Sequence, residues 1–411
     1  MAIRVLLLTQ WFDPEPTFKG MVFARELVRQ GFEVEVLTGF PNYPNGKVYA
    51  GYRIKLIQRE VIDGVQVTRV PLYPNHGHSV IKRMLNYASF AVSSLFYGLF
   101  MARRSDVIYA YHPPLTVGIT ASIIRIARSI PVVYDIQDIW PDSLRATGML
   151  NNVFALKLIA AVCQWVYRTV DHIAVLSPGF MRLLKQRNVP EAKIDVIYNW
   201  ADEAALMEPR GCLPASFPGG DRFRIVFAGN MGKAQALDSV LDAAVLLQVR
   251  SSRVCFVMIG GGVEVNRLRQ RATALRLNNV VFLPPVPLAE VGILLNAADV
   301  LLVHLRKDPL FEITIPSKTQ AYMSVGKPLL MAVDGNAADM VLQSGGGVVV
   351  ESENPGLLAK VAEDLSTLSS SALLEMGQRA KRYYQERLAL CVGVSKFGMI
   401  FRRLASVRRA R

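Results

Sequence analysis

The sequence has few cysteines, and none of them form a recognisable group. Cys163, Cys212, Cys255 and Cys391 lie far apart along the 411 residues. Disulfide-stabilised scaffolds concentrate many cysteines in a short chain, and structural zinc sites bring closely spaced pairs. The sequence therefore argues against both a disulfide framework and a metal site, and it favours a reducing compartment.

Acidic residues are also scarce, because 33 Asp and Glu stand against 47 Lys and Arg, which gives a net charge of +14. A basic chain can bind nucleic acid, yet we find no helix-turn-helix and no platform of interleaved aromatic and basic residues. We therefore expect no nucleic-acid partner. Basic residues flank apolar stretches instead, a pattern that favours an anionic membrane surface.

Long apolar runs are missing as well. The opening MAIRVLLLTQWF has too short an apolar run, and no cleavage site, for a secretory signal. Residues 84–102 carry no charge and lie between Lys82-Arg83 and Arg103-Arg104. Their length is near that of a membrane span, but Asn and Ser residues dilute them. We interpret them as a helix on the sheet with one face dipping into a bilayer surface. A wholly buried helix and a true span are the alternatives. We expect a cytoplasmic protein, peripheral at the inner face of the cytoplasmic membrane.

Two successive patterns of alternating apolar strands and helices predict the fold. The strand at 3–9 is continuously apolar, as in a parallel sheet covered on both faces. A Pro- and Gly-rich stretch at 202–221 interrupts the pattern, which restarts with a strand at 224–228. We predict an α/β fold of two doubly wound Rossmann-like domains with a cleft between them and a C-terminal helical tail. The predicted parts are an acceptor-side domain at 1–203, a linker at 204–222, a donor-binding domain at 223–390, and a basic tail at 391–411 that packs back on the N-terminal domain.

The segment 308–332, DPLFEITIPSKTQAYMSVGKPLLMA, contains the most informative motif. A helix is expected to open at Pro316-Ser317, and its free N–H groups make an anion site. Lys318 adds a cation to that helix end, and Glu312 adds a carboxylate from the preceding loop. These groups suit a negatively charged ligand with sugar hydroxyls. An ordinary capping helix is the alternative.

This segment resembles the donor-binding signature of the retaining glycosyltransferases of family four. Other stretches support the resemblance, among them LTQWFDPEP, DIQDIWPD and GNMGKAQ. They are similar to sequences of bacterial O-antigen and capsule assembly enzymes, including N-acetyl-L-fucosamine transferases. The resemblance covers nearly the entire chain and implies the GT-B fold.

The resemblance also implies where a nucleotide-sugar would bind. Transfer of a sugar requires stabilisation of the charge that develops on the departing phosphate. We expect this from the turn at 229–233, from the Ser317-Lys318 helix end, and from the glycines at 260–262. Asn230 and Gln235 stand where the family has Arg and Lys, so the phosphate role passes to Lys233. The expected donor-binding residues are Gly229, Asn230, Gln235, Gly260, Gly261, Val286 (backbone to uracil), Ser317 and Gln320.

One departure concerns the pair of family glutamates that includes the ribose-binding residue. The second glutamate is replaced by Ala321, and the first position holds Ile313 with Glu312 beside it. Either Glu312 takes the first role after a one-residue shift of the loop, or Gln320 or the backbone holds the ribose.

In the first domain, Gln137 and Asp138 stand where many family members have a His that contacts the donor sugar. Asp138 is a candidate acid/base or hydroxyl-binding group. His112 is assigned to the acceptor side with Lys19, Gly20 and Gln137. The expected catalytic residues are Asp138, Lys233, Lys318 and Glu312, and no metal is expected, because GT-B enzymes generally work without one.

The predicted function is therefore retaining transfer of a sugar, of N-acetylated amino or deoxyamino type, from a UDP-sugar to a polyprenyl-diphosphate-linked saccharide. No cofactor is expected beyond the UDP-sugar as co-substrate. A UDP-sugar epimerase on the same fold and a non-catalytic nucleotide-sugar-binding scaffold subunit are the alternatives. A nicotinamide dehydrogenase is disfavoured, because the first strand leads to Gln-Trp-Phe-Asp-Pro and not to a Gly-x-Gly-x-x-Gly turn.

Overall fold

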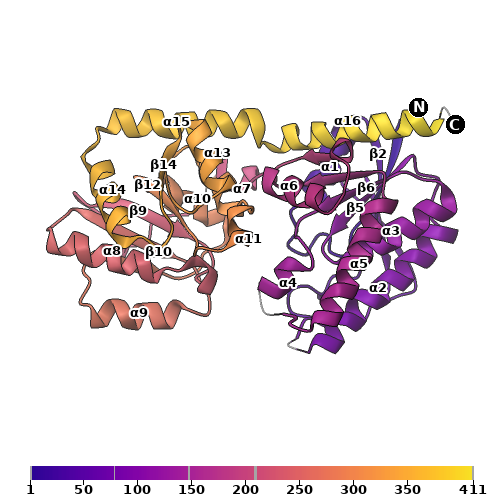
Figure 1. Ribbon diagram of the computed structural model, residues 1–411, viewed down its shortest axis with the longest axis horizontal. Coiled ribbons are helices and arrows are strands. Elements are labelled where there is room, and N and C mark those ends of the chain that lie inside the picture. The colour runs from indigo at the N-terminus through magenta and orange to yellow at the C-terminus, as the bar shows by residue number, and fades with distance from the viewer. Residues whose placement is uncertain (1, 78, 147–148, 208–210, 410–411) are drawn as a thin grey trace. The chain divides into compact units, whose positions relative to one another are not determined.

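The computed structural model describes residues 2–77, 79–146, 149–207 and 211–409. The chain divides into two compact units, the first made of 1–198 together with 393–411 and the second of 199–392. Each is a parallel-sheet α/β unit, and the chain ends in a long helix (Figure 1). The predicted α/β class, with two parallel-sheet domains and a C-terminal helical tail, is confirmed.

The sheet of the first unit has eight strands in the described residues, in the order β3-β4-β2-β1-β5-β6-β7-β8. All its pairings are parallel except that of β3 with β4. The sequence pattern did not predict β3, a half-exposed edge strand without a continuous apolar run. The strands are β1 (Ile3–Leu8), β2 (Phe32–Gly39), β3 (Gln58–Ile62), β4 (Val65–Val70), β5 (Val107–His112), β6 (Val132–Ile136), β7 (His172–Val175) and β8 (Ile194–Val196).

Helices cover both faces of this sheet. α2 packs on α3 and α3 on α5, while α1 and the C-terminal helix lie together on the other face (Figure 1). The helices are α1 (Met21–Arg29), α2 (Val80–Phe100), α3 (Leu115–Arg128), α4 (Asp142–Ala146), α5 (Val153–Thr169), α6 (Pro178–Gln186) and the short η1 (Glu191–Lys193).

The second unit has six parallel strands in the order β11-β10-β9-β12-β13-β14. α8 and α14 pack together on one face, and α10, α12, α13 and α15 gather on the other. The strands are β9 (Phe223–Ala228), β10 (Val254–Ile259), β11 (Val280–Leu283), β12 (Val300–His304), β13 (Leu329–Ala332) and β14 (Gly347–Val350). The helices are α7 (Glu203–Met207), η2 (Lys233–Gln235), α8 (Asp238–Val249), α9 (Val265–Ala274), α10 (Leu288–Asn296), α11 (Pro309–Glu312), α12 (Ser317–Val325), α13 (Asn336–Ser344), α14 (Pro355–Thr367) and α15 (Ser370–Arg387).

Each sheet has a topological switch point, at β1 in the first unit and at β9 in the second. β1 lies between β2 and β5, and β9 lies between β10 and β12. Ligands of open α/β sheets bind outside the carboxyl ends of the strands at such switch points. The loops after β1 and β5, and those after β9 and β12, are therefore where a site is expected.

The segment 204–222, predicted as a linker, begins inside α7 and belongs to the second unit; its residues 208–210 lie outside the described ranges. The final helix, α16 (Leu390–Arg409), belongs to the first unit from Gly393 onward. Phe397 of α16 packs edge-on against Phe23 of α1, with ring centroids 5.5 Å apart. Residues at the C-terminus thus complete the core of the first unit.

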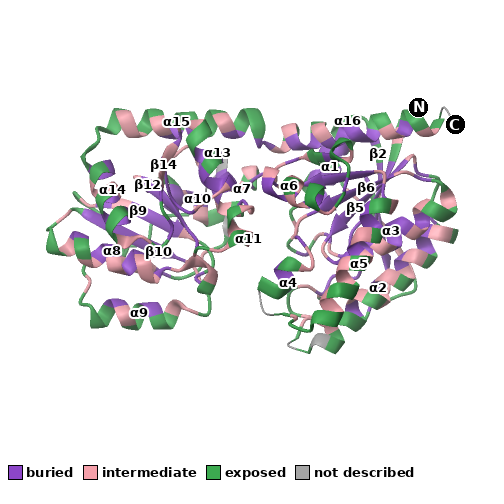
Figure 2. Cartoon of the chain, viewed as in Figure 1, coloured by how far each residue is buried: buried purple, intermediate pink, exposed green. Residues whose placement is uncertain are grey.

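The uncharged stretch 84–102 lies mostly within α2. Some of its residues are buried, such as Asn86 and Phe90, and others are exposed, such as Val92 and Phe96, so the helix shows alternating buried and exposed bands (Figure 2). Among the residues that the structure describes, no helix is long and apolar enough to cross a membrane.

Candidate functional site

The loops after β9 and β10 pack directly on each other at the switch point of the second sheet. The backbone N–H of Gly229 donates to the carbonyl of Ile259 at 2.9 Å, and that of Met231 donates to Gly261 at 2.7 Å. A Cβ on Gly260 would lie 2.1 Å from the Gly229 carbonyl oxygen. Gly260 also has a φ of +133°, which L side chains rarely adopt. The glycine run therefore has a packing reason of its own, and contact of Gly260 and Gly261 with a ligand stays a prediction.

Lys318 lies beneath this turn. Its Nζ is buried and has no hydrogen-bond partner among the described residues. It lies 3.5 Å from the ring centroid of Phe227 and 3.4 Å from the position of a Cβ on Gly229. Burial lowers the pKa of Lys318 to about 7. The ammonium is thus held, without a counter-charge, at the carboxyl end of β9.

The N-terminus of α12 provides free backbone donors next to this cation. Pro316 is the N-cap, and no side chain caps the helix. Ser317 is exposed in the first turn, as the sequence motif predicts. Tyr322, farther along the helix, bonds through its hydroxyl to the N–H of Ala228 (2.8 Å) and to its carbonyl (3.1 Å), which fixes α12 against the end of β9. An anion at this helix end would meet both the N–H groups and the Lys318 ammonium.

Sequence reasoning missed His304, the last residue of β12. The side chain is buried, and its Nδ1 bonds to the carbonyl of Gln235 at 2.7 Å. Burial lowers the pKa of His304 to about 4, and the charge of Lys318 acts in the same direction, so the ring is neutral. Its Nε2 is buried and finds no hydrogen-bond partner in the described part of the chain. The available signal was its position at the end of a strand beside β9.

The side-chain amides of Gln235 and Gln320, which were predicted to contact the donor, face backbone groups of the protein itself. The side-chain oxygen of Gln235 accepts from the N–H of Gly232 at 2.9 Å. Gln320 is buried, and its amide faces the carbonyls of Pro316 (2.8 Å) and Ser317 (3.2 Å). Gln235 therefore shapes the turn after β9, and the Gln320 amide faces the first turn of its own helix. Their direct contact with a nucleotide stays a prediction.

The other predicted donor-side residues lie at the surface of the second unit. Lys233, Asn230 and Glu312 are exposed, and Val286 is half-buried after β11. Glu312 ends the short helix α11, although a loop was expected there. Lys233 starts η2, close in sequence to the Gly229 turn.

In the first unit, Lys19 is a core residue. Its Nζ lies 3.1 Å from Oδ2 of Asp135, and both side chains are buried. Asp135 also accepts from Tyr109 (2.5 Å) and Gln137 (2.7 Å). Lys19 lies over the Phe397 ring at 4.7 Å. The structure thus gives Lys19 and Gln137 a shared partner, and their predicted acceptor contacts are untested.

Gly20 follows Lys19 in the sequence, and the hydrogen bond at the start of α1 requires a glycine at this position. Oδ2 of Asp13 accepts from the N–H of Met21 at 2.6 Å, at the beginning of α1. A Cβ on Gly20 would lie 2.2 Å from this same carboxylate oxygen. The loop after β1 therefore needs glycine here to keep the Asp13 bond.

His112 and Asp138 lie at the ends of β5 and β6. His112 is buried between Tyr134 and Trp140, with centroid distances of 5.8 and 5.4 Å, and its Nδ1 has no partner among the described residues. Burial lowers the pKa of His112 to about 3. Asp138 is half-buried and accepts from Trp140 Nε1 at 3.3 Å; burial raises the pKa of this carboxyl. His112 and Asp138 thus lie at one edge of the sheet, and Trp140 contacts both.

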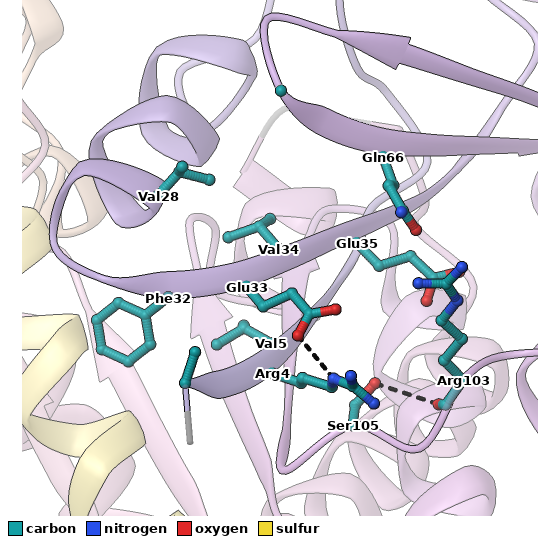
Figure 3. A pocket seen from close by; sticks show the side chains of 12 residues that line it. Arg4, Val5, Val28, Phe32, Glu33, Val34, Glu35, Gln66, Arg103 and Ser105 are labelled. Carbon is teal, nitrogen blue, oxygen red and sulfur yellow. Dashed lines mark hydrogen bonds and ion pairs between the residues drawn. The ribbon is translucent and has the colours of Figure 1, made fainter.

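Two further observations concern the described part of the chain. No group of three or more His, Cys, Asp or Glu residues there could hold a metal ion. A pocket of about 340 Å³ opens at the amino ends of β1 and β2, where Arg4 pairs with Glu33 at 2.7 Å (Figure 3). This pocket lies at the opposite edge of the sheet from the switch point and holds none of the predicted site residues.

Comparison with known proteins assigns both halves of the chain. The model of the "Glycosyl transferase 4-like domain" matches residues 21–200, and that of "Glycosyl transferases group 1" matches residues 215–383. The chain is a glycosyltransferase with the domain pair of family four.

This glycosyltransferase has relatives over most of its length. "Probable glycosyltransferase WbjE" of Pseudomonas aeruginosa is 26% identical over 74% of this chain and 76% of its own. "Putative colanic acid biosynthesis glycosyl transferase WcaI" of Escherichia coli is 27% identical over 94% and 96%. The crystal structure of HepE from Anabaena, in complex with UDP and glucose, has a TM-score of 0.66 at 16% identity, covering 97% of this chain and 99% of that one. The structural likeness supports the GT-B fold.

Proposed function

We propose that this glycosyltransferase transfers a sugar from a UDP-sugar to a polyprenyl-diphosphate-linked saccharide, with retention of the anomeric configuration. The observation that carries the donor half is the buried Nζ of Lys318 at the N-terminus of α12, which no described residue meets with a hydrogen bond. A buried cation without a counter-charge is costly, and the diphosphate of a nucleotide-sugar would supply that charge.

The same geometry suits the chemistry of transfer. Negative charge grows on the β-phosphate as the glycosidic bond to it breaks, and fixed cations and N–H groups stabilise that charge most effectively. Lys318 and the first N–H groups of α12 are held in place by Tyr322 before any ligand arrives. Lys233 is exposed at the start of η2, and in this proposal it supplies a second cation to the phosphates.

Two relatives support the choice of substrates. The structure of HepE holds UDP and glucose, which favours UDP as the nucleotide. WcaI is described as a colanic acid biosynthesis enzyme, which favours an acceptor in cell-surface polysaccharide assembly. The donor sugar of the proposal is an N-acetylated amino or deoxyamino sugar, and the acceptor end lies at Asp138 and His112.

We place the reaction at the cytoplasmic face of an anionic membrane. Lys82 and Arg83 lie in the first turn of α2, and Arg103 and Arg104 follow the helix, which has no acidic residue. Each basic residue near an anionic surface contributes about 1 kcal/mol. Co-sedimentation with vesicles tests this: binding should need anionic lipid and weaken at high salt, and indifference to lipid charge would contradict it.

The decisive experiment measures thermal unfolding with UDP, GDP and ADP. Ligands stabilise the folded protein by mass action, so UDP should raise the unfolding temperature of the wild type and much less that of Lys318→Met. Stabilisation by GDP alone would overturn the nucleotide assignment. Turnover of UDP-sugars then separates the activities: a transferase needs the acceptor, an epimerase does not, and a scaffold subunit only binds.

A further inference from the structure

An apolar groove runs along α2 in the first unit, and the proposed reaction leaves it unused. Its volume is about 880 Å³. One wall is a stripe of α2, and the other is the segment that follows β4 together with two residues ahead of β3. The lining side chains are Leu56, Ile57, Val70, Pro71, Leu72, Tyr73, Leu85, Ala88, Ser89, Val92, Ser93, Phe96, Tyr97 and Met101.

Large apolar side chains of this α2 groove stay in contact with water. Leu56 is 85% exposed, Val92 68% and Phe96 58%. The few polar side chains of the wall are used internally: the hydroxyl of Ser93 donates to the Pro71 carbonyl at 2.6 Å, and that of Ser89 accepts from the N–H of Tyr73 at 2.8 Å. The surface left to a ligand is therefore hydrocarbon, and a ligand with an apolar chain would bury it.

One end of the α2 groove is tied to the switch point of the first sheet. Asn86 of α2 donates to the Tyr73 carbonyl at 2.7 Å and to the Asn42 side chain at 3.3 Å, and accepts from Gln10 at 2.5 Å. Gln10 follows β1, and Asn42 follows β2. The groove therefore ends beside the loops where the acceptor is expected.

A cluster of rings lies at this end. Trp11 packs against Tyr43, His76 and Tyr87, with centroid distances of 4.9, 5.8 and 6.5 Å. Trp11 Nε1 and His76 Nε2 are buried, and neither has a hydrogen-bond partner among the described residues. Arg83 lies close by: burial first, and then the Arg83 charge, lower the pKa of His76. Aromatic faces with a few polar atoms, next to a cation, suit a sugar joined to a phosphate.

We propose that the α2 groove holds the polyisoprenyl chain of the lipid-diphosphate acceptor, with the diphosphate at Arg83 and the first sugars over the ring cluster around Trp11. This inference rests on the proposed function, because it names the lipid part of the same acceptor. The groove is apolar along α2 and has a cation and aromatic rings at its inner end. A lipid diphosphate is amphipathic in the matching way, with a hydrocarbon chain at one end and a diphosphate at the other.

Charge argues against a second copy of the chain as the occupant. A two-fold contact through α2 would bring Lys82 and Arg83 of both copies to one interface, and α2 has no acidic residue to pair with them. Among the described residues, neither Lys82 nor Arg83 has an acidic partner within the chain. An anionic lipid supplies the missing charge.

The test is equilibrium binding of a long polyisoprenyl diphosphate in neutral detergent micelles. The double variant Val92→Asp/Phe96→Ser changes only side chains that face water, so its fold should be intact. It should bind about tenfold more weakly or worse, because charge and polarity replace the hydrocarbon wall. The matched control is Ile126→Asp, which changes an apolar residue of α3, 61% exposed, that does not line the groove. This control should bind like the wild type.

Three competitors decide between occupants. A two-isoprene diphosphate and inorganic diphosphate should displace the long probe poorly, because they leave the groove empty. Equal displacement by inorganic diphosphate, or equal binding by the double variant, would overturn the proposal. Displacement by anionic phospholipid vesicles as effective as by the probe would make the groove a general membrane contact, and would also overturn it.

Failure of the groove proposal can be distinguished from failure of the proposed function. UDP should stabilise the double variant as it stabilises the wild type, since the changes lie outside the second unit. If the wild type binds the polyisoprenyl probe but UDP does not stabilise it, the groove proposal stands and the donor assignment is refuted. If UDP stabilises the wild type but the probe does not bind, only the groove proposal is refuted.

Discussion

The ammonium of Lys318 lies 3.5 Å from the centroid of the Phe227 ring, with no hydrogen bond to any described residue. The electron-rich face of an aromatic ring attracts a cation, yet it replaces only part of the water that the ammonium loses. An anion placed beside the ammonium would therefore stabilise it further.

Replacement of this cation should slow the reaction much more than it affects the fold. Lys318→Ala should reduce kcat by about a hundredfold or more, since one donor to developing phosphate charge contributes a few kcal/mol. Steady-state kinetics with a UDP-sugar and acceptor measures this. The control is Lys360→Ala, which removes an exposed lysine of α14 in the same unit. Full activity of Lys318→Ala would make the helix end structural.

The pH dependence should carry the signature of Lys318. Burial lowers its pKa to about 7, so above that pH the folded protein must take up a proton to present the cation to a ligand. UDP affinity should therefore fall as pH rises from 7 to 9, and Lys318→Met should abolish this slope. Titration calorimetry in buffers of different ionisation enthalpy would detect the proton uptake.

Stability should move in the opposite direction from affinity. Between about pH 7 and the ordinary lysine pKa of 10.5, the unfolded chain carries a proton on residue 318 that the folded chain lacks. The unfolded state thus binds more protons, and the free energy of unfolding rises with pH across this window. Urea denaturation of the wild type and Lys318→Met at pH 7 and pH 9 compares the two. A wild-type increase no larger than that of the variant would contradict the lowered pKa.

Gly260→Ala should destabilise the second unit by about 2–4 kcal/mol, since it combines an unfavourable φ with overlap onto a neighbouring backbone. The added methyl would lie 2.1 Å from the Gly229 carbonyl oxygen. Gly219→Ala is the matched control, because nothing lies within 4 Å of its Cβ position. Thermal denaturation of both variants should separate them by several degrees. Equal stabilities would mean that the two loops do not pack as described.

Lys19→Met should behave as the loss of a buried ion pair. It leaves Asp135 in the core with Tyr109 and Gln137 as partners but no cation, at a cost of about 3–5 kcal/mol. The comparison is Arg25→Met, which breaks the exposed pair with Asp63 and should cost at most about 1 kcal/mol. Denaturant titration gives both values. A stable Lys19→Met that has lost only acceptor binding would support the acceptor role that the sequence suggests.

Asp138→Asn should lower transfer far more than UDP stabilisation, because Asp138 belongs to the first unit and the proposed donor site to the second. Initial rates and thermal shifts on the same protein test this. Parallel losses of both would place Asp138 on the donor instead.

The motif at 308–332 predicted a helix start at Pro316-Ser317 and a cation beside it, because proline chemistry and helix ends are local properties of the chain. It could not predict the burial of Lys318, which depends on Phe227 of β9 and on Gly229 in the turn that follows. For the same reason it did not reveal His304, whose neighbours come from η2. Gln320 seemed available for a ribose in sequence, whereas in the structure its amide faces the first turn of its own helix.

From the sequence, Lys19 and Gly20, in the loop after β1, are assigned to the acceptor side. The sequence does not reveal that the Lys19 ammonium is buried beside Asp135 and the ring of Phe397, which lies far along the chain. Contacts between residues so distant in sequence leave no local pattern. The alternation of strands and helices, by contrast, depends on nearest neighbours, and the doubly wound fold could be predicted from it.

The position of Phe397 has a consequence for biosynthesis. During translation residues 1–198 leave the ribosome first, but the part of α16 that covers Phe23 and Lys19 is made only after residues 199–392. The second unit, 199–392, is complete before that helix emerges. The unit whose synthesis begins first is therefore completed last. Part of its core stays uncovered until all residues of the second unit have been made.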